Sequence, residues 1–438
     1  MNVISQTPTY NLKAVLKETG LKADVLRAWE RRYELPRPHR TPGGHRLYSE
    51  YDIETIKWLR ARQDEGLSIS HAVDLWNKTL QSGLDPFAKY QPANTPTPAR
   101  LLPATDTRIE TLRNHWLEAN LAFNSLQTDE ILNQAFAIYP VETVCTEILQ
   151  RGISEIGNYW FMDQASVQQE HFATEQARRR LETLITATPP PTRRQSVLIG
   201  CPPGEQHTFS ILLLNLFLRR RGLQVVYLGA DVPIARMAET ATTIRPDLIV
   251  LAAQQLTSAA TLHTTLLSLQ KLDIPLAYGG IIFNRIPSLR ERMPAFFLGE
   301  SLDEAIHTIE QLVVTSPSLP SAYKVDESYR ELSRQYRENR PLIEIEVFKK
   351  LSKDAQQTEF IGDANLFFGN TLSAALDLGE PAYLEADLEW VKKLLTGRDM
   401  QAERLTPYLT AYSHAISKLL GEAGMPVIDW ISLYVARN

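Results

Sequence analysis

One histidine of the chain stands where a metal ligand could be presented at the edge of a sheet. His207 lies in the stretch GCPPGEQHTFSILL, after one apolar run and before a longer one. Neutral imidazole is a good ligand for a transition metal, and a ligating histidine needs a partner that orients its second ring nitrogen. Glu205, two residues earlier, supplies a carboxylate for that purpose. Position alone does not separate this interpretation from the alternative, a surface histidine in a loop.

A second group of residues with ligand-binding chemistry precedes the first. Trp160 is followed, after nine intervening residues, by the adjacent pair Glu170 and His171. An indole can pack against a flat apolar group, while a carboxylate and an imidazole can hydrogen-bond to its polar edges. The alternative is a tryptophan of the hydrophobic core with two surface residues beside it.

Elements that would position these residues follow from the apolar pattern. Over 107–188 apolar positions recur every three or four residues, which predicts a four-helix bundle. Over 195–315 the pattern changes to short β-rich runs separated by helical segments: SVLIG, LQVVYLG, DLIVLAA, IPLAYGG and AFFLGE. This alternation predicts a doubly wound parallel sheet of the Rossmann-like type. Because ligands bind beyond the carboxyl ends of such strands, His207, in the loop after the first strand, lies where a ligand is expected.

Length and composition bound the class of protein. The 438 residues, of which 44% are hydrophobic and 22% charged, suit a globular protein of about three domains. No apolar run reaches about 18 residues, so we expect no membrane span. The N-terminus lacks a basic segment followed by an apolar one, so we expect no signal peptide. The two cysteines form neither a disulfide framework nor a zinc cluster, so a cytoplasmic location is expected. Pro-rich stretches at 81–106 and 186–195 read as linkers.

Charge is distributed unevenly along the chain. The net charge is −5, yet residues 13–62 carry twelve basic and seven acidic residues. This asymmetry indicates that one domain contacts a polyanion. Within residues 8–80 a short helix, a turn at Gly20 and a second helix from about Lys22 precede the stretch PRPHRTPGGHRLY, which predicts a β-hairpin wing.

This N-terminal stretch, with its pattern LRAWERRY…P.RT.GGHRLYSEYDI, resembles the winged-helix domain of MerR-type transcriptional regulators. The resemblance implies operator DNA as a partner and a homo-oligomer, a dimer or tetramer. It also implies that the second helix reads DNA and that the wing contacts the backbone, through five residues: Arg27, Arg31, Arg40, His45 and Arg46. The long dimerisation helix and the metal-binding cysteine loop of metal-sensing members are not evident, so the downstream domains are expected to sense the effector.

The stretch GEQHTFS resembles the axial-histidine loop of cobalamin-binding domains, although Ser210 replaces their glycine. Three further stretches support the resemblance: YLGADVP, AQQLTS and YGGIIFN. It implies that His207 is the lower axial ligand of the cobalt, oriented by Glu205, and that Thr257, Gly279 and Gly280 adjoin the nucleotide tail. At a position where these domains usually carry serine, this chain has Ala253.

The spacing from Trp160 to Glu170 and His171 resembles the cap of CarH-type photoreceptors, and so does the order of the domains. The resemblance implies adenosylcobalamin, whose adenosyl group these three residues would contact. It also implies repression in the dark by an oligomer that leaves DNA in light. Phe161 departs from the pattern, because the best-known members place there a histidine that captures the cobalt after photolysis. The fate of the cobalt and the oligomer mechanism are therefore open.

Residues 325–438 read as four or five amphipathic helices without cysteine, which excludes a thioether-linked chromophore. An appended helical region resembles photocobilins, which implies biliverdin as a ligand. Arginines would pair with its propionates and aromatic rings would stack on it. An oligomerisation or partner-binding bundle is the alternative. The candidate bilin-binding residues are Arg337, Arg340, Tyr383, Trp390, Tyr408, Tyr412 and His414.

The sequence thus predicts a multidomain α and α/β protein: a winged helix-turn-helix, a four-helix bundle, a doubly wound parallel sheet and a C-terminal helical bundle. The expected function is a light-responsive transcriptional regulator, not an enzyme. One alternative is a cofactor-independent MerR-type repressor controlled by a protein partner. A cobalamin-dependent enzyme is disfavoured, because no substrate barrel of about 250 residues is present.

Overall fold

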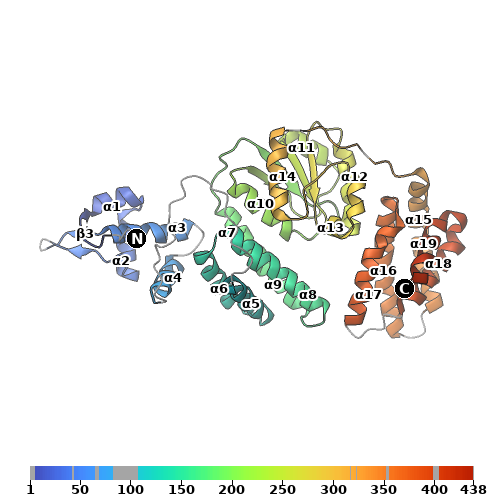
Figure 1. Cartoon of the computed structure of the whole chain (residues 1–438), viewed down its shortest axis with the longest axis horizontal. Coiled ribbons are helices and arrows are strands. Elements are labelled where there is room, and N and C mark those ends of the chain that lie inside the picture. Colours follow the sequence, from blue (N-terminus) through green and yellow to red (C-terminus); the bar gives the residue numbers. More distant parts are fainter. Residues whose placement is uncertain are drawn as a thin grey trace. The chain divides into compact units, whose positions relative to one another are not determined.

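The computed structural model describes residues 5–41, 44–64, 69–81, 107–315, 317–321, 323–351, 355–397 and 404–437. The chain divides into two compact units: Met1–Ile156 with His171–Ala187, and Gly157–Glu170 with Thr188–Asn438. Figure 1 labels many of their helices. Apart from Gln81, the predicted linker 81–106 lies outside the described residues.

The first unit begins with the predicted winged helix-turn-helix. Its three-stranded antiparallel sheet has the order β1-β3-β2. The Asn11 side chain caps the first helix by accepting from the backbone N–H of Ala14 at 3.0 Å, and Gly20 ends that helix at a φ of +67°. The elements are β1 (Tyr10–Asn11), α1 (Leu12–Thr19), α2 (Ala23–Tyr33), β2 (His39–Arg40), β3 (Arg46–Tyr48), α3 (Glu50–Asp64) and α4 (Ile69–Gln81).

Three buried tryptophans fix α2 in this domain. Trp29 of α2, Trp58 of α3 and Trp76 of α4 all belong to one hydrophobic core. The rings of Trp58 and Trp76 meet edge to face with centroids 5.2 Å apart. Because Trp29 points into the core, the opposite side of α2 is left to solvent.

The helical bundle follows, and all of it except Gly157–Glu170 belongs to the same unit. α5 (Thr107–Leu121) and α6 (Ser125–Ile138) precede a continuous run in which the π-helix η1 (Cys145–Gln150) joins α7 (Val141–Val144) to α8 (Arg151–Phe161). α9 (Val167–Thr186) completes the predicted bundle. Gly152 allows a close approach here, because a Cβ would come within 2.7 Å of the Trp116 ring.

The second unit contains the predicted parallel sheet. Its strands have the order β5-β4-β6-β7-β8, and all neighbouring pairs are parallel. Helices cover both faces (Figure 1), so the central strand β6 is buried along its whole length. The strands are β4 (Ser196–Gly200), β5 (Gln224–Tyr227), β6 (Leu248–Ala252), β7 (Leu276–Gly279) and β8 (Phe296–Phe297). The helices are α10 (Phe209–Arg220), α11 (Met237–Ile244), α12 (Leu256–Leu269), α13 (Ile282–Arg285), η2 (Pro287–Arg292) and α14 (Leu302–Thr315).

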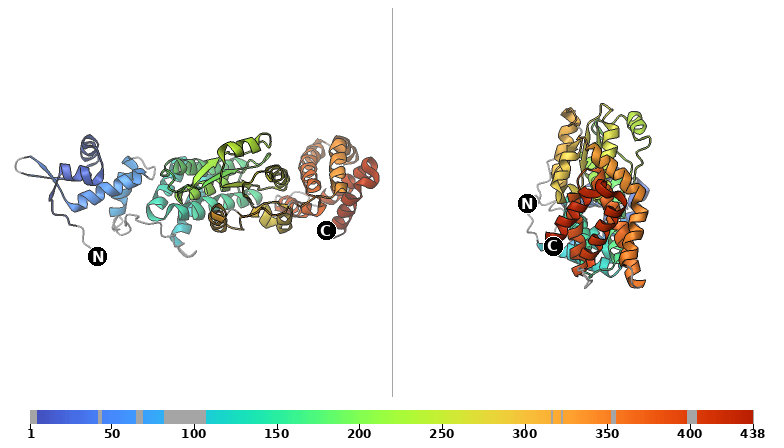
Figure 2. Two further views of the ribbon diagram at one scale, coloured as in Figure 1. Left: turned by 90° about the horizontal axis from the view of Figure 1, so that it is seen from above. Right: turned by 90° about the vertical axis from the view of Figure 1, so that its right-hand side faces the viewer.

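The C-terminal bundle, seen in the right-hand view of Figure 2, continues this unit. One hydrophobic core runs from the sheet through α12 into the bundle, where Leu266, Leu372 and Ile416 belong to the same cluster. The bundle comprises α15 (Glu327–Leu351), α16 (Ala355–Asp377), η3 (Pro381–Tyr383), α17 (Leu384–Gly397), α18 (Leu405–Leu420), η5 (Gly421–Gly424) and α19 (Met425–Arg437).

No membrane-spanning helix is expected from the sequence, yet one described segment is long and apolar enough to cross a membrane. This segment is Leu405–Arg437, with a mean hydropathy of 1.2. In the structure it is two helices separated by η5 (Gly421–Gly424), and Tyr412 and Ile431 lie in the bundle core. Core helices of bundles share such length and composition, so the segment is weak evidence for a membrane span.

A buried histidine in this shared core predicts that the free energy of unfolding depends on pH. His263 on α12 is 5% exposed, and its Nε2 has no hydrogen-bond partner among the described residues. Burial lowers the pKa of His263, partly offset by Asp377, while Arg292 and Arg330 lower it further. The unfolded chain therefore binds more protons than the folded chain just below the ordinary histidine pKa.

We expect the free energy of unfolding of the wild type, relative to that of the His263→Gln variant, to fall as the pH drops from 7.5 to 5.5, because the contributions of the other histidines are common to both proteins. Urea midpoints at the two pH values measure it. His414→Gln, which replaces an exposed histidine of α18, serves as the matched control and should keep the wild-type profile. Equal pH profiles for wild type and His263→Gln would contradict the expectation.

Candidate ligand site and DNA interface

The loop after β4 holds His207 and Glu205 in a hydrogen bond. Glu205 is 1% exposed, whereas the side chain of His207 is 60% exposed. Nδ1 of His207 lies 2.7 Å from Oε1 of Glu205, and the backbone N–H of His207 donates to the same oxygen at 2.8 Å. Because the carboxylate engages Nδ1, Nε2 is the ring nitrogen available to a ligand.

The second carboxylate oxygen of Glu205 ties this loop to the end of β6. Oε2 accepts from the backbone N–H of Gln254 at 2.6 Å and from Oγ of Ser258 at 2.6 Å. Burial alone would raise the pKa of Glu205, but its hydrogen bonds with His207, Ser258 and Gln254 hold that pKa below its ordinary value. The buried group is therefore a carboxylate at neutral pH.

This charge acts on the histidine ring. The hydrogen bond that the His207 ring makes with the Glu205 carboxylate raises the pKa of His207. Burial of the ring lowers this pKa, and the negative charges of Glu205 and Glu170 raise it further. A hydrogen-bonded carboxylate orients an imidazole and increases its basicity as a metal ligand. Within the described residues, no group of three or more His, Cys, Asp and Glu side chains is placed to hold a metal ion. The ring of His207 can supply one ligand to a metal.

The site lies at the switch point of the sheet. Counted along the chain, the strand order is 2-1-3-4-5, so the connections from β4 and β6 leave the sheet in opposite directions. Doubly wound sheets open a crevice between two such strands at their carboxyl ends. His207 follows β4, whereas Gln254 and Ser258 follow β6, and the hydrogen bonds of Glu205 join the two sides of this crevice.

The side-chain amide of Gln254, at the crevice, has only part of its hydrogen bonds within the described residues. Gln254 Oε1 accepts from the backbone N–H of Ile281 at 3.0 Å, but its buried Nε2 has no partner among the described residues. Beside it, Gly280 has a φ of +128°, and a Cβ there would lie 1.7 Å from the carbonyl oxygen of Ala253. Gly279 is less constrained, because its Cβ would make only ordinary contacts with Leu298. An orphaned buried donor beside a glycine loop fits a polar group of a bound cofactor.

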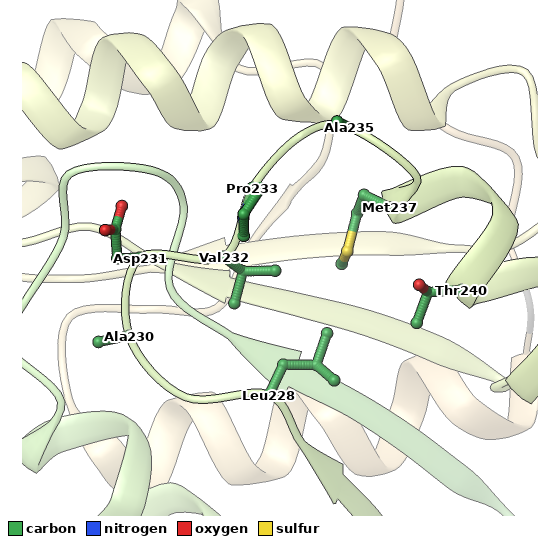
Figure 3. A pocket seen from close by; sticks show the side chains of 8 residues that line it. All are labelled: Leu228, Ala230, Asp231, Val232, Pro233, Ala235, Met237 and Thr240. Carbon is green, nitrogen blue, oxygen red and sulfur yellow. The ribbon is translucent and has the colours of Figure 1, made fainter.

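Asp231 braces the other side of the loop that carries His207. It accepts from the backbone N–H of Gly204 at 2.7 Å, and its own N–H donates to the carbonyl of Glu205 at 3.0 Å. Figure 3 shows this residue at the rim of a cavity of about 250 Å³ after β5. Burial raises the pKa of the nearby Cys201 thiol to about 12, with a contribution from Glu205, so the thiol is protonated at neutral pH. The cavity lining is Leu228, Ala230, Asp231, Val232, Pro233, Ala235, Met237 and Thr240.

The predicted cap and tail residues lie in several places. Trp160 ends α8 and is half-buried, with Trp390 stacked against it at a centroid distance of 6.4 Å. Glu170 is half-buried and His171 is exposed at the start of α9. Thr257 is half-buried in the first turn of α12. Of the residues around Glu205, the sequence did not single out Gln254, Ser258 or Asp231.

Most of the predicted bilin-binding residues already have partners within the protein. Tyr408 and Tyr412 are buried in the bundle core, and the Tyr412 hydroxyl bonds that of Tyr336 at 2.6 Å. Arg337 pairs with Asp377 and Arg340 with Glu344, so both guanidinium groups already have carboxylate partners. In addition, Tyr383 accepts from Arg292 at 3.0 Å, Trp390 stacks on Trp160, and His414 is exposed.

The predicted DNA-binding residues divide into two groups. Arg27 and Arg31 are exposed on α2, and Arg40 and His45 are exposed in the wing. Arg46 instead pairs with Glu30 at 2.9 Å, and Glu30 also accepts from the Tyr48 hydroxyl at 2.5 Å. Arg46 therefore holds the wing strand β3 to α2, and the exposed four are placed to contact a polyanion. Gly43 of the predicted turn lies outside the described residues.

Family models match three regions of the chain. The model "MerR HTH family regulatory protein" matches residues 10–78, and two models described as "B12 binding domain" match 112–185 and 195–306. A winged helix joined to B12-binding domains defines a class of cobalamin-linked transcriptional regulators.

Two relatives identify the family more closely. The transcriptional repressor CarH of Myxococcus xanthus is 30% identical over 296 residues, which cover 67% of this chain and 96% of CarH. CarA of the same organism is 30% identical over 56% of this chain and 76% of its own length. The monomethylamine corrinoid protein of Methanosarcina barkeri aligns with 47% of this chain and 99% of its own, at 21% identity and a TM-score of 0.41. The chain belongs to the CarH and CarA family of MerR-type transcriptional regulators.

Replacing Glu205 tests the anchor of the site. In Glu205→Ala, Ser258 Oγ and two backbone N–H groups lose their acceptor, so we expect the free energy of unfolding to fall by about 2 kcal/mol. Since the wild-type carboxylate has a lowered pKa, the difference should shrink as the pH falls below about 4. Urea unfolding measures both. His207→Ala, at an exposed side chain, should cost less than about 1 kcal/mol, and equal losses in the two variants would contradict this assignment.

Replacing Arg27 tests the DNA interface. We expect Arg27→Ala to weaken binding by about 10- to 100-fold, because base and phosphate contacts from one arginine contribute about 1–3 kcal/mol. The probe is a duplex selected from a random pool with the wild-type protein, and binding is measured by fluorescence anisotropy at several salt concentrations. Arg334→Ala, which removes an exposed arginine of α15, is the control and should bind like wild type.

Proposed function

We propose that the chain is a transcriptional regulator that senses light through adenosylcobalamin and changes its oligomeric state and DNA binding in response. The observation that carries the proposal is the pair of Glu205 and His207 at the switch point of the sheet, in a chain that also has a winged helix. The proposal makes it a regulator rather than an enzyme, acting in the cytoplasm as a dimer or tetramer on operator DNA, without a membrane partner.

Residues of the crevice would bind the cofactor from below. Nε2 of His207 is the proposed lower ligand of the cobalt, held in orientation by Glu205. The orphaned Nε2 of Gln254 donates a hydrogen bond, and Gly279 with Gly280 leaves room for the nucleotide tail. Thr257 lies on the same side as a further polar contact. When bound, adenosylcobalamin supplies a cobalt–carbon bond that light breaks.

Residues of the cap would read the upper face. Trp160 packs against the adenosyl group, while Glu170 and His171 hydrogen-bond to its polar edges. Contacts made only with the intact group favour one arrangement of the bundle, so their loss shifts the population toward another. A DNA-binding oligomer that depends on the first arrangement would then dissociate.

Absorption spectra of the full chain test this function. Reconstitution with adenosylcobalamin in the dark should give a bound cobalamin spectrum that converts under green light. His207→Ala should lose the shift that a histidine ligand causes. Gly279→Ala keeps the apo fold, since its Cβ has space, but should weaken cobalamin binding if the tail lies there. Gly280→Ala is not a useful variant, because it would clash with Ala253.

Two results would contradict the proposal. If adenosylcobalamin does not bind, or if His207→Ala leaves the DNA response unchanged, the alternative gains: a cofactor-independent repressor controlled by a protein partner. Binding without any spectral change under light would leave a cobalamin-linked regulator that is not a photoreceptor. Size-exclusion chromatography in dark and light measures the oligomeric change directly.

Biliverdin binding by the C-terminal bundle stays a prediction. The core position of Tyr412 and the carboxylate partners of Arg337 and Arg340 mean that a bilin would have to displace existing contacts. A long-wavelength band after addition of biliverdin that persists in His207→Ala would support a site in this bundle. Without that band, an oligomerisation or partner-binding bundle is the better description.

A further inference from the structure

A tryptophan of the C-terminal bundle lies at the centre of an aromatic cluster that includes the cap. Trp390 of α17 stacks on Trp160 with centroids 6.4 Å apart and planes inclined by 25°. Its ring also meets Phe161 at 5.7 Å and Phe367 of α16 at 6.5 Å. Separations of this size are those of favourable aromatic pairs. The end of α8 and α17 (Figure 1) are therefore joined through Trp390.

The helix that carries Trp390 is also fixed to the glycine-loop side of the sheet. Arg285, at the end of α13, pairs with Asp387 at 3.6 Å and donates to the carbonyl of Ala386 at 3.4 Å. Asp387 lies three residues before Trp390 on α17, and α13 directly follows Gly279 and Gly280. Tyr383, just before α17, accepts from Arg292 at 3.0 Å. α17 thus contacts the sheet domain through its first turn and the end of α8, at Trp160 and Phe161, through its second.

This arrangement restrains the indole of Trp160. An indole has two faces, and the near-parallel ring of Trp390 packs at one side of the Trp160 ring. A side chain backed by a second ring has fewer accessible rotamers, so less conformational entropy is lost when a ligand packs on its other face. Since α17 is itself tied to Arg285, the backing ring has a fixed place relative to the loop after β7.

We propose that Trp390 is a positioning residue for the cap: it holds Trp160 in the orientation that contacts the adenosyl group, so the C-terminal bundle sets the preference of the site for cobalamins with a bulky upper ligand. This inference rests on the proposed function, in which Trp160 covers that group. It gives the C-terminal bundle a part in recognising the cofactor, independent of any chromophore of its own.

The experiment compares full-length wild type, Trp160→Ala, Trp390→Ala and Trp390→Phe. Dissociation constants for adenosylcobalamin and for aquocobalamin, which lacks the adenosyl group, are measured in the dark. Trp390→Ala should weaken adenosylcobalamin by about five- to tenfold and aquocobalamin by less than about twofold, and Trp390→Phe should restore most of the loss. Arg285→Ala, which loosens α17 without touching the cluster, should reproduce part of the same selective effect.

A second measurement, made on the cofactor-free protein, accompanies these titrations. In near-ultraviolet circular dichroism of the cofactor-free protein, Trp160→Ala and Trp390→Ala should each remove the same signal of the stacked pair. If Trp390→Ala weakens both cobalamins equally or neither, or if the two variants remove different signals, the proposal is overturned. If Trp160→Ala itself binds both cobalamins like wild type, the cap assignment in the proposed function fails, and this inference fails with it.

Discussion

A single buried carboxylate holds the candidate site together. Glu205 lies in the loop between β4 and α10, and its two oxygens accept hydrogen bonds from that loop, from the end of β6 and from the first turn of α12. A buried charge is costly unless it is hydrogen-bonded or paired, so these partners are held in place as strictly as the carboxylate itself. The orientation of the His207 ring follows from this local requirement.

The sequence could predict the parts of the site whose residues lie close together along the chain. The spacing of Glu205 and His207 is two residues, and the strands around them are apolar runs. The predicted sheet is confirmed, and the two side chains are hydrogen-bonded in the structure. Ser258 and Gln254 complete the same network from about fifty residues away. Both lie in the stretch AQQLTS that supports the resemblance, but only the folded chain shows that they hydrogen-bond to Glu205. Asp231 is similar, because its role comes from a contact with Gly204 across two loops.

Some predicted site residues have partners within the protein that the local sequence does not show. Arg46 stands among basic residues of the wing, but its charge is taken up by Glu30 of α2, a pairing that only the folded domain reveals. Tyr408 and Tyr412 recur at helical spacing, which suits a ligand pocket and a core equally well, and the structure buries both side chains in the bundle core. The pairing of Arg337 with Asp377 likewise spans forty residues and leaves no trace in the local pattern.

The hydrophobic core that runs from the sheet into the C-terminal helices has a consequence for how this part of the chain folds. Two domains with separate cores can melt separately, but side chains of α12, α16 and α18 share one cluster, so neither half can lose its packing without exposing the other. The second unit should behave as one cooperative block in unfolding and in hydrogen exchange. An ancestral chain that acquired these helices would have gained a structural partner for its sheet at the same moment, and a chain cut back to the sheet alone would present a bare apolar surface along α12.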